Sequence, residues 1–218
     1  MNKAVIFDLD GTLLNTLGDL TAAVNHALTV RGLPTRTEAQ VRTYLGDGVR
    51  ELVVRACPAD TDEDVRSGVM AAYLPYYAAH NMDLTRPYEG VLSLLDDLRA
   101  AGYRIAVVSN KHDAGAQALC GKFFADYLDL TVGADGSRPL KPAPDGVLYA
   151  MERLQVSPDA VWYVGDSVQD VRTAHNAGVK CAAVTWGFQD AHRLAAENPT
   201  VMVDSVAQLR EVILSKEV

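Results

Sequence analysis

Only three cysteines occur among the 218 residues, and no two of them are spaced as a CxxC pair. Cys57, Cys120 and Cys181 lie far apart, so neither a disulfide framework nor a zinc site is indicated. Isolated cysteines of this kind usually behave as small apolar side chains in a reducing compartment. We therefore expect all three to be packed structural residues.

Long hydrophobic runs are also missing from the sequence. No stretch approaches the roughly 20 apolar residues that a membrane span needs. Near the start, the chain reaches Asp8 after only four consecutive apolar residues, which is too short for the apolar region of a signal peptide. We therefore expect a cytoplasmic protein that has no membrane partner.

Basic residues are fewer than acidic ones: the sequence has 20 lysines and arginines and 28 aspartates and glutamates, which gives a net charge of -8. A chain of this charge would be repelled by a nucleic-acid backbone, which argues against a nucleic-acid partner. A small anionic substrate could bind only where a local cation reverses the field.

Strand patterns are absent between residues 15 and 81. Apolar residues recur there at helical spacing, which predicts four helices, at 17–31, 37–45, 49–57 and 62–80. We expect the last of them to bend near Pro75.

After residue 88, strands and helices alternate with short connections. The predicted strands are 103–109, 127–133, 160–165, 180–187 and 200–204, and the predicted helices are 91–102, 113–122, 145–154, 168–178, 190–197 and 206–214. Such alternation predicts parallel strands joined by right-handed crossovers. The fold class is therefore α/β, a doubly wound parallel sheet. We expect residues 1–14 and 82–218 to form this core, and residues 15–81 to form a helical cap inserted after the first strand.

Polar residues stand where the predicted strands end. Ligands of open α/β sheets bind outside the carboxyl ends of the strands, so these residues should converge on one edge of the sheet: Asp8 and Asp10 after the first strand, Ser109 and Asn110 after the second, and Asp166 with Asp170 after a later one. Lys141 lies in a polar connection between two prolines. Four carboxylates, a hydroxyl group and an ammonium group are therefore expected together.

Four neighbouring carboxylates would repel one another unless a cation joined them. Magnesium, which prefers oxygen ligands and commonly binds carboxylates together with a substrate phosphate, would remove the repulsion. Asp8 and Asp10 are two residues apart in an extended segment and can reach one centre. One aspartate is then available to attack phosphorus as a nucleophile, while Ser109, the backbone N–H of Asn110 and Lys141 hold the phosphoryl oxygens.

This set of residues resembles the motifs of the haloacid dehalogenase superfamily, in the branch that hydrolyses phosphate esters. The resemblance lies in four motifs in the family's order: Asp8-Leu9-Asp10-Gly11-Thr12, Ser109-Asn110, Lys141-Pro142, and Gly165-Asp166 with Asp170. It implies that Asp8 attacks phosphorus and that Asp10 first protonates the leaving alcohol and then deprotonates water. It also implies Mg²⁺ held by the Asp8 and Asp166 carboxylates and the Asp10 backbone carbonyl, with Asp170 in support.

The resemblance also bears on the substrate. Family members that act as dehalogenases lack the second aspartate, so Asp10 favours a phosphate ester. The stretch Tyr44–Leu52 resembles the cap loop of phosphoglycolate phosphatase-like members, and it implies a substrate loop containing Gly46, Gly48 and Arg50. The expected partner is thus a small phosphorylated metabolite, with 2-phosphoglycolate as the first candidate. Asn15 departs from the family, where aspartate is common at this position.

Simpler interpretations stay open for two features. Asp170 could be a carboxylate of the first helical turn, stabilised there by the helix dipole. The loop with Gly46, Gly48 and Arg50 could be an ordinary connection between two helices. The oligomeric state is equally open between a monomer and a homodimer.

The same site residues would also be compatible with other functions. The same scaffold could serve a phosphosugar mutase, a pyrophosphatase or a nucleotidase. A non-catalytic receiver module phosphorylated on aspartate would also join acidic residues, Mg²⁺ and a Lys-Pro pair, although the chain is much longer than one such module. Phosphonate cleavage through a cap lysine is excluded, because residues 17–81 contain no lysine.

Overall fold

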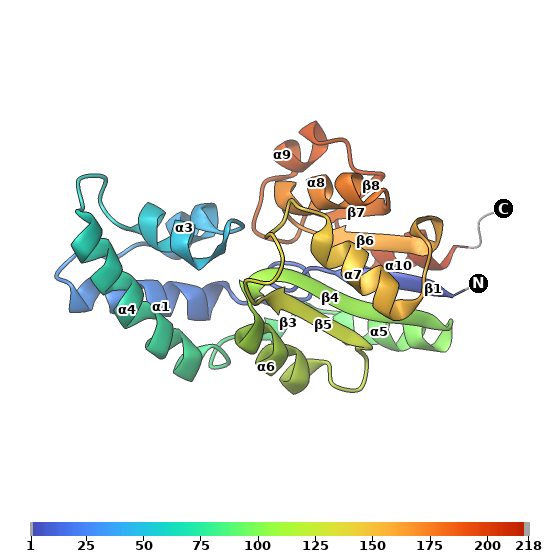
Figure 1. Ribbon diagram of the computed structural model, residues 1–218, viewed down its shortest axis with the longest axis horizontal. Coiled ribbons are helices and arrows are strands. Elements are labelled where there is room, and N and C mark those ends of the chain that lie inside the picture. Colours follow the sequence, from blue (N-terminus) through green and yellow to red (C-terminus); the bar gives the residue numbers. More distant parts are fainter. Residues whose placement is uncertain (1, 216–218) are drawn as a thin grey trace. The chain divides into compact units, whose positions relative to one another are not determined.

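The computed structural model describes residues 2–215, and these form two compact units (Figure 1). Of the described residues, one unit contains 2–14 and 87–215, and the other contains 15–86. The division falls within two short strands, β2 (Leu14–Asn15) and β3 (Arg86–Pro87), which make a two-stranded sheet of their own. Neither strand was expected, because segments of two residues leave no periodic signal in a sequence.

The larger unit is built on a six-stranded parallel sheet in the order β5-β4-β1-β6-β7-β8. The chain leaves β1 toward β4 and β5 and then returns to the other side of β1, so the strand order reverses next to β1. In open α/β sheets this reversal marks the place where ligands bind. The strands are β1 (Lys3–Phe7), β4 (Tyr103–His112), β5 (Leu130–Ala134), β6 (Val161–Gly165), β7 (Lys180–Val184) and β8 (Val201–Val203).

Helices cover both faces of this sheet, which confirms the predicted doubly wound α/β class (Figure 1). On one face, alternate strand residues such as Ala4, Ile6 and Ala106 are completely buried against α7 and α8. The intervening residues Val5 and Phe7 are completely buried as well, as expected for a strand whose successive side chains point to two covered faces. The helices of this unit are α5 (Val91–Ala100), α6 (Asp113–Phe123), α7 (Asp145–Leu154), α8 (Val168–Ala177), α9 (Ala191–Ala196) and α10 (Val206–Leu214), with a 3₁₀ turn at Pro158–Ala160.

Three strand boundaries differ by three residues from the sequence-based expectation, and the first is that of β4, which extends to His112 rather than ending at residue 109, so that Ser109 lies within it. Strand β5 begins at Leu130, three residues later than expected, because the Asp129 side chain accepts hydrogen bonds from the Ile105 backbone and the Arg99 and Arg104 side chains. Strand β7 ends at Val184 rather than at residue 187. The residues that follow it turn toward the carboxyl edge of the sheet, where Phe188 donates a backbone hydrogen bond to Asp166.

The smaller unit is a helical insertion of α1 (Leu17–Val30), α2 (Glu38–Tyr44), α3 (Gly48–Ala56) and α4 (Glu63–His80), as expected. Helix α1 packs along α4, and α4 runs through Pro75 without interruption. The two ends of the insertion are joined at Asp19, which is only 3% exposed. Its carboxylate accepts hydrogen bonds from the Leu84 backbone (2.9 Å), the Thr85 backbone (2.8 Å) and the Thr85 hydroxyl group (2.7 Å).

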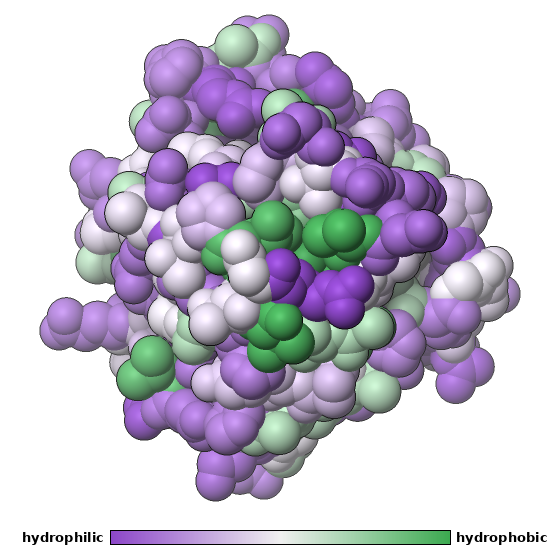
Figure 2. Space-filling view, turned by 90° about the vertical axis from the view of Figure 1, so that its left-hand side faces the viewer, coloured by the Kyte–Doolittle hydropathy of each residue, from purple (hydrophilic) through white to green (hydrophobic). Residues whose placement is uncertain are grey.

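The surface seen from the left-hand side of Figure 1 is largely hydrophilic (Figure 2). Its hydrophobic residues form small groups near the centre, surrounded by hydrophilic ones. Nothing on this face favours a homodimer over a monomer. Among the described residues, no helix combines the length and the apolar character that crossing a membrane requires.

Candidate active site

The ends of β1, β4 and β6 lie side by side at the carboxyl edge of the sheet. Phe7, the last residue of β1, pairs with Val107 on one side and Val164 on the other. The backbone N–H of Asp8 donates to the Val164 carbonyl at 2.8 Å, which continues the pairing by one residue. The predicted residues Asp8, Ser109 and Asp166 therefore emerge from neighbouring strands, as the rule for parallel sheets requires.

Three buried carboxylates meet at this edge. Asp8, Asp166 and Asp170 each place one oxygen within 4.8 Å of the other two. Carboxylate oxygens at this separation are the ligands that a hard cation such as Mg²⁺ prefers. Asp10 lies beside this group without joining it through its own carboxylate. The cluster therefore fits a divalent metal ion.

The Asp166 carboxylate is held in one orientation by residues from two distant loops. Thr12 donates its hydroxyl hydrogen bond to one oxygen at 3.0 Å, and the Phe188 backbone N–H donates to the other at 2.7 Å. Two glycines allow this close packing: a Cβ atom at Gly11 would lie 2.3 Å, and one at Gly187 2.2 Å, from an Asp166 atom. Gly11 also has φ of +88°, a conformation that other residues rarely adopt.

Lys141 supplies the positive charge nearest to the cluster. Its ammonium nitrogen lies 2.9 Å from an Asp8 oxygen and 2.7 Å from an Asp170 oxygen, and it is 3.2 Å from the Tyr163 hydroxyl oxygen. The Asn110 side chain fixes the backbone of Lys141 from both sides, accepting from its N–H at 2.8 Å and donating to its carbonyl at 3.1 Å. Asn110 thus positions Lys141, a contact that the sequence analysis did not anticipate.

Asp170 has protein partners on both of its carboxylate oxygens. One oxygen accepts from Lys141 and from the Tyr163 hydroxyl group at 3.0 Å. The other accepts from the Ser167 backbone N–H at 3.0 Å and from the Ser167 hydroxyl group at 2.5 Å, which forms a capping box at the start of α8. The side chain thus caps the first turn of α8 and also anchors Lys141, while its support of a metal ion stays a prediction.

Tyr163 is the central residue that the sequence analysis missed. It was expected only as a buried strand residue, and it is indeed fully buried within β6. Its hydroxyl group, however, lies 3.3 Å from the Val108 carbonyl and within hydrogen-bonding distance of Lys141 and Asp170. Since tyrosine is common in buried strands, nothing in the local sequence marked this hydroxyl group as part of the site.

Burial of these charges shifts their pKa values. Burial raises the pKa of Asp8 from 3.8 to about 6 against the attraction of Lys141, and the charges of Asp170 and Asp10 add to the increase. Burial, followed by the charges of Asp170 and Asp8, raises the pKa of Asp166 well above its usual value. For Lys141, burial acts to lower the pKa, yet the charges of Asp170 and Asp8 outweigh it and raise the pKa. The site therefore holds more negative charge than Lys141 alone balances.

The raised pKa of Asp8 predicts how stability depends on pH in the metal-free protein. The folded protein binds the Asp8 proton more tightly than the unfolded chain does, so Asp8 lowers the free energy of unfolding as pH rises from about 4 to about 6. In urea unfolding with a chelator present, the free energy of the wild type relative to Asp8→Asn should fall by up to about 3 kcal/mol across this range. A difference that grows with pH would contradict the prediction.

A second lysine reaches the site, whereas the sequence analysis counted only Lys141 as nearby. The ammonium nitrogen of Lys111 lies 3.1 Å from both carboxylate oxygens of Asp10. Strand alternation does not identify it, because the pairing of β4 with β5 is irregular between Val108 and His112 and the Lys111 backbone N–H turns back to the Ser109 hydroxyl oxygen. Asp10 therefore has a cationic partner of its own.

The predicted cap loop belongs to the smaller unit. Gly46 and Gly48 have φ of +117° and +84°, and Arg50 is an exposed residue of α3. Within the loop, Asp47 pairs with Arg55 at 2.5 Å. Asn15 is also in this unit, where its side chain accepts from the Leu17 backbone N–H at 3.3 Å at the start of α1. A substrate role for Gly46, Gly48 and Arg50 stays a prediction.

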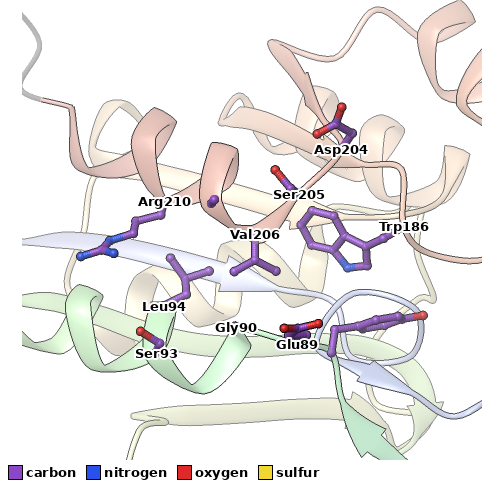
Figure 3. Close-up of a pocket in the computed structure, with 11 residues that line it drawn as sticks. Glu89, Gly90, Ser93, Leu94, Trp186, Asp204, Ser205, Val206 and Arg210 are labelled. Carbon is purple, nitrogen blue, oxygen red and sulfur yellow. The ribbon is translucent and has the colours of Figure 1, made fainter.

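The larger unit also has a pocket of about 480 Å³ between the starts of α5 and α10 (Figure 3). Trp186 lies at one end of it, and Leu94 and Val206 lie next to each other along its wall (Figure 3). None of the residues that line it belongs to the predicted site. Two of its lining residues contact the loop after β1: the Trp186 indole N–H donates to the Thr12 carbonyl at 3.2 Å, and the Tyr88 backbone N–H donates to the Leu13 carbonyl at 3.1 Å. The wall of the pocket is thus joined to the loop from which Thr12 contacts Asp166.

Comparisons with known proteins agree with this geometry. The family model for haloacid dehalogenase-like hydrolases matches residues 5–184. A phosphoglycolate phosphatase of Vibrio parahaemolyticus is 33% identical over 222 residues, which are 97% of this chain and 96% of that protein. A phosphoglycolate phosphatase of Rhodospirillum rubrum is 38% identical over 196 residues, 86% of this chain and 81% of that protein.

A solved structure shows that the likeness extends to the whole fold. The crystal structure of a protein from Lactobacillus delbrueckii subsp. bulgaricus has a TM-score of 0.93 and 33% sequence identity, and the match covers 99% of this chain and 100% of that one. The family model contains every predicted catalytic, metal and phosphate-binding position, from Asp8 to Asp170. The chain therefore belongs to the haloacid dehalogenase-like hydrolases, and within that family it resembles the phosphatases.

Proposed function

We propose that this protein is a magnesium-dependent phosphatase that hydrolyses a small phosphate monoester through an aspartyl-phosphate intermediate, with 2-phosphoglycolate as its substrate. The observation that carries the proposal is the buried cluster of Asp8, Asp166 and Asp170 around Lys141 at the carboxyl edge of the sheet. The substrate is proposed from the likeness to phosphoglycolate phosphatases over nearly the full chain.

In the proposed reaction, Asp8 and Asp10 divide the chemistry between them. A carboxylate oxygen of Asp8 attacks phosphorus, forming an acyl phosphate while the bond from phosphorus to the ester oxygen breaks. Asp10 donates a proton to the departing oxygen, and it then takes a proton from the water that attacks the acyl phosphate. Inorganic phosphate leaves, and Asp8 returns to its starting state.

The metal ion would be held by the Asp8 and Asp166 carboxylates and the Asp10 backbone carbonyl. Asp170 would act indirectly, because its two oxygens already have Lys141, Tyr163 and Ser167 as partners. When bound, Mg²⁺ would offset the charge of the carboxylates and of the phosphoryl oxygens.

The phosphoryl oxygens would be held by the Ser109 hydroxyl group, the Asn110 backbone N–H and the Lys141 ammonium group. Ser109 and Lys141 are both buried, with 8% of each residue exposed. Donors that are fixed and shielded from water stabilise the growing negative charge more strongly than mobile surface groups do.

The helical insertion would serve as the cap that excludes water during turnover. Its loop with Gly46, Gly48 and Arg50 would contact the substrate, because glycine allows close approach of the backbone to a ligand. We take residues 15–86 as the cap, which extends the expected segment of residues 15–81 by five residues to the boundary of the compact unit.

The alternatives differ in how far the findings favour them. The receiver module is set aside, because the chain belongs to a hydrolase family and contains the helical insertion. A phosphosugar mutase, a pyrophosphatase or a nucleotidase would use the same aspartates, so only the substrate distinguishes them from the proposed phosphatase. No contact among the described residues favours one of these three.

The direct test is phosphate release from a panel of small esters that includes 2-phosphoglycolate, a hexose phosphate, pyrophosphate and a nucleoside monophosphate. We expect phosphate release to be fastest from 2-phosphoglycolate. Its rate should fall at least about 100-fold when a chelator removes Mg²⁺. Faster release from another compound would mean that the proposed substrate is wrong and that the proposed mechanism stands. No release from any compound would overturn the proposed function.

A further inference from the structure

Lys111 lies outside the set of residues that the proposed reaction uses, although it forms an ion pair with Asp10, which the reaction does use. Both distances from the Lys111 nitrogen to the Asp10 oxygens are 3.1 Å, so the ammonium group is centred on the carboxylate. The side chain of Lys111 is 8% exposed and that of Asp10 is 21% exposed. A lysine that reaches this far into a site is unlike the solvated lysines that usually cover a protein surface.

Two contacts direct the Lys111 side chain toward Asp10. Its backbone N–H donates to the Ser109 hydroxyl oxygen at 3.3 Å. Its carbon chain lies over the first turn of α6, where a Cβ atom built on Gly115 would be 3.6 Å from Cε and 3.9 Å from Cδ. The aliphatic part is therefore packed, and the charged end projects beyond it.

The pairing of Lys111 places its ammonium group away from the phosphoryl site at Asp8. The nitrogen lies 3.1 Å from both Asp10 carboxylate oxygens, and the Asp10 carboxylate is outside the cluster of Asp8, Asp166 and Asp170. Lys141 already faces Asp8 at 2.9 Å and supplies the positive charge at the point of attack. Lys111 is thus placed beside Asp10, and Asp10 must face the leaving group in order to protonate it.

The charge at this place selects among leaving groups. An ammonium group beside Asp10 attracts a leaving group that carries its own negative charge, and it gives no such advantage to a neutral alcohol. A carboxylate one carbon from the ester oxygen would remain within reach of Lys111 while the phosphoryl group occupies the site at Asp8. Lysine has three N–H donors and can bind Asp10 and a second carboxylate together.

We propose that Lys111 is a specificity-determining residue that recognises a carboxylate on the leaving group of the substrate. This inference rests on the proposed phosphatase function and adds to it the residue that distinguishes a phosphorylated hydroxy acid from a phosphorylated neutral alcohol. It assigns to Lys111, within the larger unit, a selection that was expected to depend on the cap loop alone.

The experiment compares two esters that differ only in this group, 2-phosphoglycolate and 2-hydroxyethyl phosphate. For each protein, kcat/KM is measured with both esters, and their ratio is the readout. Any general effect of Lys111 on Asp10 acts on both esters and cancels in the ratio. We expect Lys111→Met to lower the ratio about 100-fold, while Lys111→Arg, which keeps the charge, retains most of it. Lys122→Met, on the exposed end of α6, is the matched control and should leave the ratio unchanged.

The outcomes separate the inference from the proposed function. A wild type that hydrolyses neither ester refutes 2-phosphoglycolate as the substrate and with it the role of Lys111, whereas the phosphatase itself is refuted only if no compound of the full panel releases phosphate. A wild type that hydrolyses both esters equally, or a Lys111→Met protein that keeps the wild-type ratio, refutes the role of Lys111 and leaves the phosphatase in place. Circular dichroism checks folding, and Lys111→Gln replaces the methionine variant if that protein does not fold.

Discussion

Replacing Asp8 with asparagine is expected to reduce phosphate release at least about 1000-fold while the protein remains folded. The amide has nearly the same shape as the carboxylate but cannot attack phosphorus. Asp8 is buried, and burial raises its pKa to about 6, so the charged side chain is costly to hold in the metal-free protein. Removing this charge should therefore leave the unfolding midpoint at neutral pH unchanged or slightly higher.

The measurement is steady-state release from 2-phosphoglycolate together with circular dichroism and urea unfolding. Asp159→Asn is a suitable control, because Asp159 is an exposed residue of the 3₁₀ turn before β6 and lies outside the predicted site. A folded Asp8→Asn protein with activity close to that of the wild type would show that another residue is the nucleophile. Loss of activity in the control would point to a general sensitivity of the fold.

Replacing Lys141 with methionine should have the largest effect on stability, because it removes the cation from a buried group of carboxylates. The Lys141 side chain is 5% exposed and that of Asp170 is not exposed at all. Removing one partner of a buried ion pair typically costs about 3–5 kcal/mol, since the remaining charge is left without compensation. Phosphate release should be lost as well, because Lys141 would hold the transferring phosphoryl group.

A double-mutant cycle identifies the origin of this loss. The free energies of unfolding are compared for the wild type, Lys141→Met, Asp170→Asn and the double variant. If the uncompensated Asp170 charge is responsible, Lys141→Met should cost at least about 1 kcal/mol less in the Asp170→Asn background. Equal costs in both backgrounds would mean that the loss does not arise from Asp170, which leaves the pairing with Asp8 or packing as its origin. Lys122→Met again serves as the control for replacing a lysine with methionine.

Much of the site could be predicted because its residues follow a local rule. Asp8, Ser109 and Asp166 each stand at or just after the end of an apolar strand, and parallel strands bring such positions to one edge. This rule needs only the order of residues along the chain. The alternation of strands and helices that identified the α/β class is local in the same way.

The residues that were missed depend on contacts between distant parts of the chain. Lys111 and Asp10 are 101 positions apart, and Thr12 and Asp166 are 154 positions apart. The Tyr163 hydroxyl group lies within hydrogen-bonding distance of both Lys141 and Asp170, which are 29 positions apart. No periodicity in the sequence states which strand is the neighbour of which.

The sequence by itself determined the fold class, the helical insertion after the first strand and the aspartates at the strand ends. Hydrophobic periodicity and polar residues after apolar strands are local features, so the order of residues is enough to identify them. Only the tertiary structure decided how the charges are paired: Lys141 with Asp8 and Asp170, and Lys111 with Asp10. Both lysines lie about a hundred residues or more after the first acidic motif, and Lys141 lies 29 positions before Asp170. A sequence offers no reason for either lysine to prefer one aspartate. Strand order and side-chain burial make that choice, since each ammonium group reaches only the carboxylates that its own strand or loop places beside it.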